Sequence, residues 1–464
     1  MLNKEGNALK VKILPALFAL CLLLGGCSGS GDGIGAYMRP PKLTGEQAGV
    51  QEALEAMLTT NYTLIFPKSG DYRSAYVPFD IDNDNVAEML VFYRLNVEGA
   101  VTRINILDKI DGKWTSIGDI AGQGADVEKV SFGDLNKDGE IEIIVGWSMV
   151  SVNEKVFSVY SFNEAAVKNN VSNITASGGD VLTLRFSESY SEMLVIDFTG
   201  DDVLDILFIN LNSALKTSVA SLMQMTDNGC EIVGKISIDG NVTSYAQVLS
   251  GRIGTFPALF ADAYKGANLM ITEILYYNGK SMVSLSYDDK EQVTKSTERS
   301  STILSKDIDE DGNIEVPMPT ALPGYENKNN DEKINIVYWR RYNTKEYSTV
   351  LNTIHNYAGG YYVIVPDAYK DHLSVKFDTA NQTMVFYEYL QNLPKFGREV
   401  FQIKIFKSDE FANGLKDGFE MLAERKGSTY AFKLSTEITR EQADNQRLFF
   451  PDIKSMKECF RLVQ

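Results

Sequence analysis

The stretch FGDLNKDGEIEIIVGW, residues 132–147, joins a short acidic loop to an apolar run typical of a β-strand. Oxygen-bearing side chains occupy loop positions 1, 3, 5 and 9, namely Asp134, Asn136, Asp138 and Glu142. Such alternation directs several oxygens toward one centre, as a hard cation such as calcium requires. One loop of this kind can equally be only a turn, because Asp, Asn and Gly are turn formers.

The pattern recurs in three further places, which makes a simple turn a weaker explanation. The other stretches are FDIDNDNVAEMLVFY from Phe79, IDFTGDDVLDILFINL from Ile196 and KDIDEDGNIEVPMP from Lys306. Successive loops start 54, 63 and 110 residues apart, and the last interval is twice 55. We therefore expect a repeat protein with one repeat lacking its acidic loop. The candidate is LFADAYKGANLMITEILYY from Leu259, which keeps Asp262 and a following strand but binds no metal.

The predicted ligands are the oxygen-bearing residues at positions 1, 3, 5 and 9 of each loop. They are Asp80, Asp82, Asp84 and Glu88; Asp134, Asn136, Asp138 and Glu142; Asp197, Thr199, Asp201 and Asp205; and Asp307, Asp309, Asp311 and Glu315. Position 7 would supply a backbone carbonyl. Position 6 requires a left-handed turn, which suits glycine and then asparagine, so Asp202 makes the third loop the least favourable. We expect the bound calcium to be structural.

These loops differ from EF-hands in their scaffold. An EF-hand carries a bidentate Glu at position 12 between two helices. Position 12 here is Val91, Val145, Phe208 or Met318, and the flanking segments are rich in β-branched residues. After each loop the sequence predicts an apolar strand, a second strand and a turn into a third. A unit of about four strands in 45–65 residues has the size of a propeller blade.

On these residues the chain resembles the FG-GAP/VCBS repeats of integrin-type β-propellers, over roughly residues 60–345. The resemblance implies a mainly β fold, a ring of about five to seven four-stranded blades, with calcium on the ligands named above. The departures are Asn85 and Asp202 at the glycine position, Thr199 at position 3, and the stripped loop at Asp262.

The segments outside the repeats have other signatures. A helix is expected over Thr44–Leu58, so the propeller region is assigned to residues 44–350. Residues 351–464 are predicted to form a small α+β module. Its expected strands cover 361–366, 373–377, 384–389, 401–406 and 430–434, and its expected helices cover 409–425 and 454–462. An alternative boundary lies near residue 390, where a last blade could end.

The N-terminus resembles a bacterial lipoprotein signal. Lys4, Lys10 and Lys12 precede a 12-residue apolar run, followed by Leu24-Gly25-Gly26-Cys27. By this resemblance residues 1–27 are a signal peptide with a lipobox, and Cys27 carries acyl chains such as palmitate. Residues 28–43 then form a flexible tether. An ordinary signal peptide with an incidental cysteine is the alternative. We expect a cell-envelope protein, lipid-anchored on the extracytoplasmic face of a membrane.

The charge and composition of the chain limit the classes of partner that it is expected to bind. The formal net charge is −17, and removal of the signal peptide takes away three lysines and one glutamate, leaving −19. This charge argues against nucleic acid and against broad binding to anionic lipid. The 23 tyrosines and 23 phenylalanines argue against a disordered acidic tail. Cys230 and Cys459 are far apart in sequence, and free thiols are favoured over a disulfide.

Catalytic signatures are weak. The two histidines, His355 and His372, are interpreted as surface or loop residues, since no nucleophile elbow accompanies them. Gly359-Gly360 is expected to form a hairpin turn. The run Tyr338–Tyr342 (YWRRY) either stacks on a sugar or binds a carboxylate, or is an amphipathic strand, which is favoured. No catalytic residue is assigned.

The expected function is binding or scaffolding by the propeller, with an unknown protein or glycan as ligand. The alternative is an enzyme, a propeller-type polysaccharide lyase or hydrolase.

Overall fold

The computed structural model describes residues 45–149, 154–170, 181–226, 229–329 and 332–463. The predicted signal peptide, Cys27, the tether and Thr44 lie outside these residues. The chain divides into two compact units, Met1–Met57 and Leu58–Gln464. The first contains α2 (Gly45–Met57), where the predicted helix is confirmed and where Val50 and Leu54 are buried. Within the described ranges, no helix is long and apolar enough to cross a membrane.

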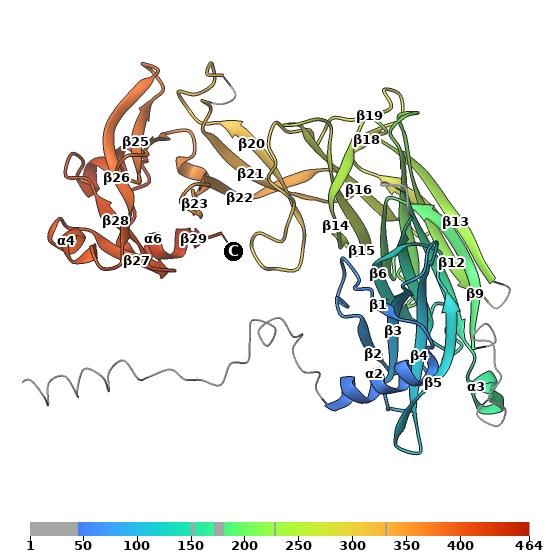
Figure 1. Ribbon diagram of the computed structural model, residues 1–464. Helices are drawn as coiled ribbons and strands as arrows, with labels where there is room; N and C mark the ends of the chain where they lie inside the picture. Colours follow the sequence, from blue (N-terminus) through green and yellow to red (C-terminus); the bar gives the residue numbers. More distant parts are fainter. Residues whose placement is uncertain (1–44, 150–153, 171–180, 227–228, 330–331, 464) are drawn as a thin grey trace, which may run out of the picture. The chain divides into compact units, whose positions relative to one another are not determined.

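The second unit is mainly β and consists of antiparallel sheets, numbered here in chain order (Figure 1). Sheet 1 contains β1 (Tyr62–Leu64), β2 (Tyr76–Phe79), β3 (Glu88–Leu95), β4 (Thr102–Ile110) and β5 (Lys113–Ala121). Sheet 2 contains β6 (Asp126–Gly133), β7 (Glu142–Ser148), β8 (Lys155–Phe162) and β9 (Leu182–Tyr190), with α3 (Glu164–Asn170) between its last two strands. Sheet 3 contains β10 (Glu192–Ile196), β11 (Asp205–Asn212), β12 (Thr217–Thr226) and β13 (Gly229–Ile238).

The later sheets follow a similar plan. Sheet 4 contains β14 (Ser244–Ile253), β15 (Phe256–Tyr264), β16 (Met270–Tyr277) and β17 (Met282–Ser284), and a small ribbon of β18 (Tyr287–Asp288) and β19 (Val293–Thr294) follows. Sheet 5 contains β20 (Glu315–Ala321), β21 (Asn335–Tyr342), β22 (Tyr347–Asn356), β23 (Tyr361–Ile364) and β29 (Phe460–Leu462). Sheet 6 contains β24 (Leu373–Asp378), β25 (Thr383–Leu390), β26 (Lys395–Lys407), β28 (Ser428–Leu434) and β27 (Glu420–Arg425).

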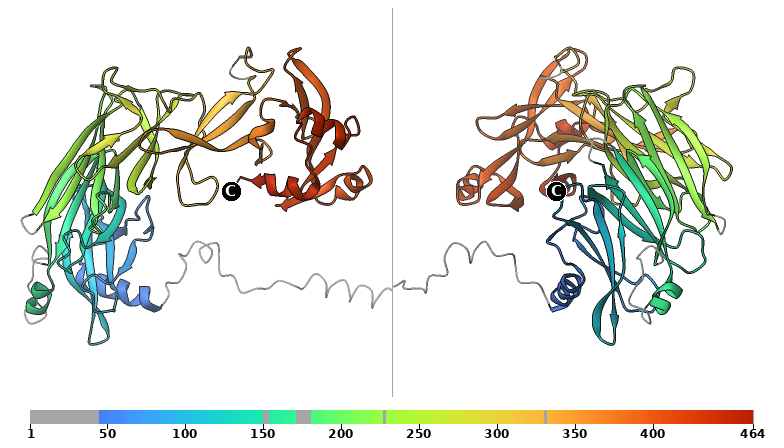
Figure 2. Two further views of the ribbon diagram at one scale, coloured as in Figure 1. Left: turned by 180° about the vertical axis from the view of Figure 1, so that it is seen from behind. Right: turned by 45° about the vertical axis from the view of Figure 1, so that its right-hand side comes forward.

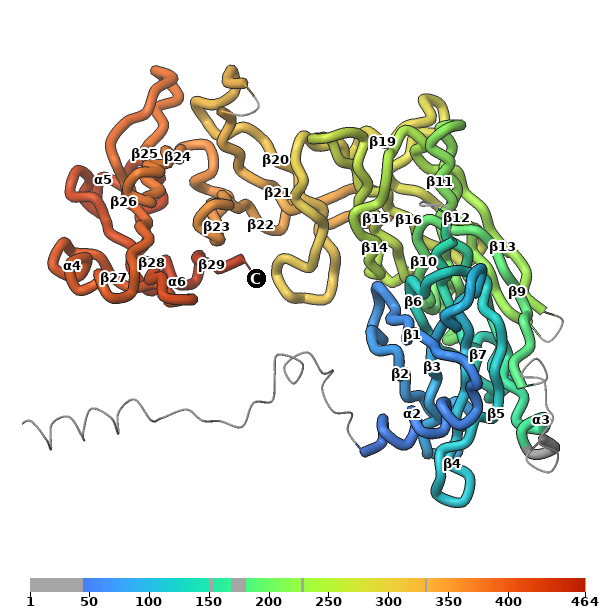
Figure 3. Tube along the Cα trace, viewed as in Figure 1, coloured from blue at the N-terminus to red at the C-terminus, as the bar shows by residue number. Residues whose placement is uncertain are grey.

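Strands pair in chain order within sheets 2, 3 and 4, so each of these is a four-stranded meander. In sheet 1, β1 and β2 both pair with β3 and together take the place of one strand. The chain end returns to sheet 5, where β29 pairs with β23, as the trace in Figure 3 shows. The repeated antiparallel unit expected from the sequence is therefore confirmed.

Neighbouring sheets pack face to face, and both views in Figure 2 show sheets 1 to 4 following one another. In β7, Ile143 belongs to the core shared with sheet 1, whereas Ile144 belongs to the core shared with sheet 3. In β11, Phe208 packs toward sheet 2 and Leu207 toward sheet 4. Side chains alternate between the two faces of a strand, so a strand covered on both sides needs a continuous apolar run. This explains the apolar run after each acidic loop.

Sheet 4 corrects the predicted position of the stripped repeat. Asp262 does not begin a loop; it lies within β15, paired with Gln247 on β14 and Thr272 on β16. The acidic loop's place, between the first two strands, is taken by a two-residue turn at 254–255. Asp262 is fully buried and forms an ion pair of 2.8 Å with Arg299, also fully buried. A buried carboxylate needs such a partner, which accounts for this acid in a strand.

Sheets 5 and 6 share one core, which includes Ile354 of β22 and Phe386 of β25. Two helices near the C-terminus, α5 (Arg440–Gln446) and α6 (Ile453–Cys459), contribute Ala443 and Met456 to this core. A 3-10 turn, η3 (Asp367–Tyr369), connects the two sheets. The predicted boundary at residue 350 falls inside β22.

One predicted helix in this region is wrong. Instead of a helix over 409–425, α4 (Phe411–Lys416) is followed by β27, which pairs with β28. Gly418 between them has a φ of +83°, a left-handed conformation that ends the helix. The final helix, expected to reach residue 462, ends at Cys459 because residues 460–462 form β29.

Candidate metal centre

The four acidic loops are one structure built four times. Loops 1, 2, 3 and 5 (residues 80–88, 134–142, 197–205 and 307–315) are numbered after their sheets. The residue before each loop pairs with the residue at position 9, as in Phe79 with Glu88 and Lys306 with Glu315. Gly133 with Glu142 and Ile196 with Asp205 repeat this register. The flanks are strands or a strand bridge, so the predicted β scaffold is confirmed for these loops.

The carboxylates organise each loop through the backbone. The acid at position 1 accepts a hydrogen bond from the N–H of position 6, at 2.7–3.0 Å, in all four loops. The acid at position 5 accepts from the N–H of position 7, at 2.7–3.0 Å. Asp, unlike Glu, is short enough to bond its own local backbone in this way. The carboxylates at positions 1 and 5 therefore stabilise the same backbone turn in every loop.

Two backbone positions in each loop are left-handed. Position 6, for which the sequence predicted this conformation, has φ between 63° and 89°. Position 4, which the sequence analysis missed, has φ between 59° and 77°. Its residues are Asn83, Lys137, Gly200 and Glu310. Lysine and glutamate have no special preference for this conformation, so only the loop geometry reveals it.

The carboxylate at position 9 has a second role that the sequence did not reveal. It accepts a hydrogen bond from the N–H of position 2, at 2.7–3.1 Å, in all four loops. These carboxylates are at most 1 % exposed. Burial raises the pKa of Glu88 and of Glu142 to about 7, because the charged form loses hydration. A nearby cation would favour the charged form.

The residue opposite position 9 on the next strand distinguishes the loops. It is Ser161 for loop 2, Gln224 for loop 3 and Arg341 for loop 5. In sheet 1, Leu107 pairs with Met89, which sets Asp108 opposite Glu88. Asp108 adds repulsion that contributes to the raised pKa of Glu88. The residue opposite position 9 is therefore an acid for loop 1, a neutral group for loops 2 and 3, and a cation for loop 5.

Loop 1 has the strongest case for a cation. Carboxylate oxygens of Asp80, Asp82 and Glu88 lie within 4.8 Å of one another. Asp82 also has a raised pKa, mainly because of burial. Clustered oxygens beside the added charge of Asp108 fit a hard divalent ion.

Loop 5 gathers Asp307, Asp309 and Asp311 within the same distance, but Arg341 already neutralises it. The guanidinium lies 3.0 Å from Asp309, 2.8 Å from Asp311 and 2.7 Å from Glu315. Arg341 of the run Tyr338–Tyr342 thus pairs with carboxylates of this chain. Because a resident cation reduces the charge available to a metal, this loop fits calcium less well.

Loops 2 and 3 are intermediate. In loop 2, the Glu142 carboxylate accepts a hydrogen bond from the Ser161 hydroxyl at 3.2 Å. In loop 3, Asp205 accepts hydrogen bonds from the Thr199 hydroxyl at 3.2 Å and from Gln224 at 2.9 Å. These neutral donors leave the carboxylate at position 9 of loop 3 with fewer free oxygens than that of loop 1.

The first three loops touch their neighbours. The amide of Asn83 in loop 1 donates to the carbonyl of Gly139 in loop 2, at 2.8 Å. The ammonium of Lys137 in loop 2 donates to the carbonyl of Asp201 in loop 3, at 3.0 Å. Both contacts start from position 4. The left-handed turn at that position thus contributes to a continuous edge of acidic loops.

Other predicted sites differ in outcome. His355 was interpreted as a surface residue but is buried on β22, beside Trp339 and Tyr362. His372 lies in the turn before β24. Gly359-Gly360 forms the predicted turn between β22 and β23, and residues 338–342 lie on the predicted amphipathic strand, β21. Cys230 and Cys459 are free thiols.

Comparisons with known proteins give no family. No protein-family model matches the chain, and no curated protein matches it. Among solved structures, the Sqt1 protein of Saccharomyces cerevisiae is similar at 10% identity and a TM-score of 0.30, over 82% of this chain and 100% of that one. An alpha-L-arabinofuranosidase of Fusarium graminearum is similar at 11% identity and a TM-score of 0.28, over 81% of this chain and 98% of that one. The periplasmic gluconolactonase of Pseudomonas aeruginosa is similar at 12% identity and a TM-score of 0.25, over 67% of this chain and 81% of that one. Scores this low support no functional argument.

Proposed function

We propose that this chain is a lipid-anchored binding module of the cell envelope, with a β-propeller-type array of blades and calcium in its acidic loops. The observation that carries the proposal is the fourfold repetition of one loop. Four loops share the register, the backbone hydrogen bonds and the left-handed positions. The stacked four-stranded sheets have the size and pairing order of blades.

Calcium would bind best in loop 1, then in loop 2, then in loop 3. The ligands would be the oxygens at positions 1, 3, 5 and 9, with position 7 contributing its carbonyl. The ion would be structural, because it neutralises crowded carboxylates at the corner between two strands. In loop 5, Arg341 would supply the positive charge instead.

The architecture supports the proposed binding role. Repeated blades bury their faces against one another and leave the connecting loops at the edges for a partner. The strongly negative chain, at −17, disfavours nucleic acid as that partner. A lipid on Cys27 would hold the module at the outer face of a membrane.

Fractionation of cells that produce the full chain tests this placement. The native protein should sediment with membranes and be cleaved when protease is added to intact cells or spheroplasts. Cys27→Ala should release it, whereas Cys21→Ala, in the predicted signal peptide, should leave it attached. Membrane association of the Cys27→Ala variant, or protection of the native chain in the cytoplasm, would contradict the proposal.

A further inference from the structure

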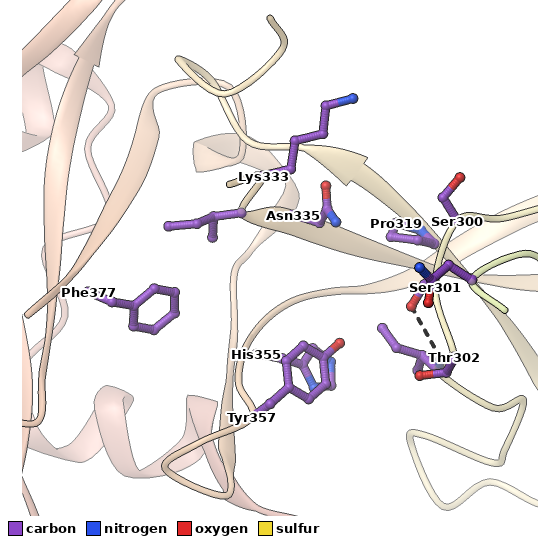
Figure 4. Close-up of a pocket in the computed structure, with 12 residues that line it drawn as sticks. Ser300, Ser301, Thr302, Pro319, Lys333, Asn335, His355, Tyr357 and Phe377 are labelled. Carbon is purple, nitrogen blue, oxygen red and sulfur yellow. Dashed lines mark hydrogen bonds between the residues drawn. The ribbon is translucent and has the colours of Figure 1, made fainter. Parts of the chain in front are cut away.

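Two adjoining cavities lie where sheets 5 and 6 meet. Their volumes are about 580 and 510 Å³, within the range of small-molecule sites, roughly 300–1,000 Å³. Three residues line both of them: His355 of β22, Tyr357 just after it, and Phe377 of β24. The two cavities therefore form one continuous depression, part of which is drawn in Figure 4.

Tyr357 is the unusual residue of this depression. The residue is 67 % exposed, although its ring lies flat on His355 with ring centres 5.3 Å apart and planes 16° apart. His355 in turn stacks on Tyr362 at 5.1 Å. Figure 4 shows the Tyr357 ring lying over that of His355. The stack orients an aromatic face that would otherwise rotate freely, so little entropy remains to be lost on binding.

His355 supports this stack as a neutral ring. Burial lowers its pKa to about 4, and the charge of Lys306 adds to that effect. Trp339 donates to the Thr353 hydroxyl at 2.8 Å, and that hydroxyl lies 2.9 Å from His355 Nε2. Thr353 has no other acceptor among the described residues, so it donates to Nε2. The proton of the neutral imidazole then sits on Nδ1.

The remaining walls combine apolar side chains, such as Ile303, Ile334 and Ile405, with uncharged polar ones. Ser300, Thr302 and Asn335 line one cavity, and Thr379 and Gln382 line the other. Hydroxyls and amides both donate and accept hydrogen bonds. Among the residues that the structure describes, the fully charged lining side chains are Lys333 and Asp378, one of each sign. The site thus combines aromatic faces with uncharged, bifunctional hydrogen-bonding groups.

We propose that this depression binds a neutral oligosaccharide, with one sugar ring stacked on Tyr357. Sugars have an apolar C–H face that packs on an aromatic ring and a rim of hydroxyls that suits amides and hydroxyls. Lys333 and Asp378 balance each other, so an anionic polymer gains no net attraction, and the −17 chain repels it. This inference rests on the proposed binding role and names the ligand class for it.

The test is a printed array of neutral hexasaccharides: β-1,4-glucan, α-1,4-glucan, β-1,4-mannan and β-1,4-xylan. Polygalacturonate is the anionic comparison, and the probe is the full-length chain in mild detergent. We expect binding to at least one neutral glycan, weakened at least tenfold by Tyr357→Ala and retained in Tyr357→Phe. Tyr347→Ala is the matched control, because Tyr347 is also an exposed tyrosine, 49 %, but lines neither cavity.

Three results would overturn the assignment: no binding to any neutral glycan, binding to polygalacturonate alone, or binding that Tyr357→Ala leaves unchanged. Melting curves of each variant separate loss of binding from loss of fold. Tyr357 is largely exposed, so its alanine variant should melt as the native protein does. Membrane fractionation tests the anchor independently, so a negative array would remove the glycan and leave the envelope location untouched.

Discussion

Arg341 places its guanidinium 2.7 Å from the buried carboxylate of Glu315, directly across the strand pair that closes loop 5. The equivalent position in sheet 1 holds Asp108, an acid. One structural position thus carries opposite charges in the first and last of the acidic loops. Under the proposed calcium binding, this position would decide whether a loop supplies its own cation or takes one from solution.

Replacing Arg341 should make loop 5 dependent on calcium. Arg341→Met leaves Asp309, Asp311 and Glu315 without their counter-charge, which should lower the melting temperature in chelator because the buried Glu315 carboxylate loses its ion pair. Added calcium should restore more stability to this variant than to the native chain. Thermal melting with and without calcium measures both effects. Arg340→Met is the control, since Arg340 stacks on Tyr347 at 4.1 Å instead. A variant that melts like the native chain in both conditions would refute this role.

Asp108 should strengthen the cation site of loop 1. Asp108→Ser gives sheet 1 the residue that sheet 2 has at this position, and it removes one negative charge beside Glu88. Because ligand charge tunes calcium affinity, we expect a dissociation constant roughly tenfold higher for the tightest site. Calorimetric titration with calcium measures it. Asp111→Ser is the control, because it also removes one negative charge but lies in the turn between β4 and β5 rather than opposite Glu88. Equal changes in calcium affinity in the two variants would contradict a specific role for the place of Asp108 opposite Glu88.

His355 should make stability fall in mild acid. Its pKa is about 4 in the folded chain, against about 6.5 when unfolded, so the unfolded chain binds more protons between these values. Stability therefore rises with pH across this window, and acidification from pH 6.5 to 4 costs up to about 3 kcal/mol. Urea unfolding at several pH values should show a shallower dependence in His355→Gln. An identical slope in the variant and the native chain would exclude His355 as the source.

The ion pair between Arg299 and Asp262 should be costly to break from one side. Arg299→Met leaves a fully buried carboxylate without its cation, which should destabilise the fold by about 3–5 kcal/mol. The double variant with Asp262→Asn removes the stranded charge and should recover much of that loss. Denaturant unfolding of both proteins provides the comparison. A double variant no more stable than the single one would contradict the charge explanation.

The sequence predicted the repeated units well, because their signal is local. Acids at fixed spacing before an apolar run mark each hairpin loop, and the run itself reflects burial on both faces. Even the left-handed position 6 followed from Gly139 and Gly312.

Other features depend on contacts that spacing cannot reveal. Asp108, Ser161, Gln224 and Arg341 gain their importance from strand register across a sheet. Asp262 resembled a loop acid in sequence, but its partner Arg299 is 37 residues away. His355 looked like a surface residue because nothing local shows that Trp339 and Tyr362 cover it. The depression that Tyr357 lines likewise exists only once sheets 5 and 6 meet.

The central claim is that the acidic loops hold divalent calcium at the corners of the sheets. Thermal melting of the full chain in calcium and in excess chelator tests it most directly. Metal at one hundred times its dissociation constant adds about 2.7 kcal/mol per site to the folded state, so the melting temperature should rise by several degrees in calcium. Superimposable melting curves in calcium and chelator would contradict the account.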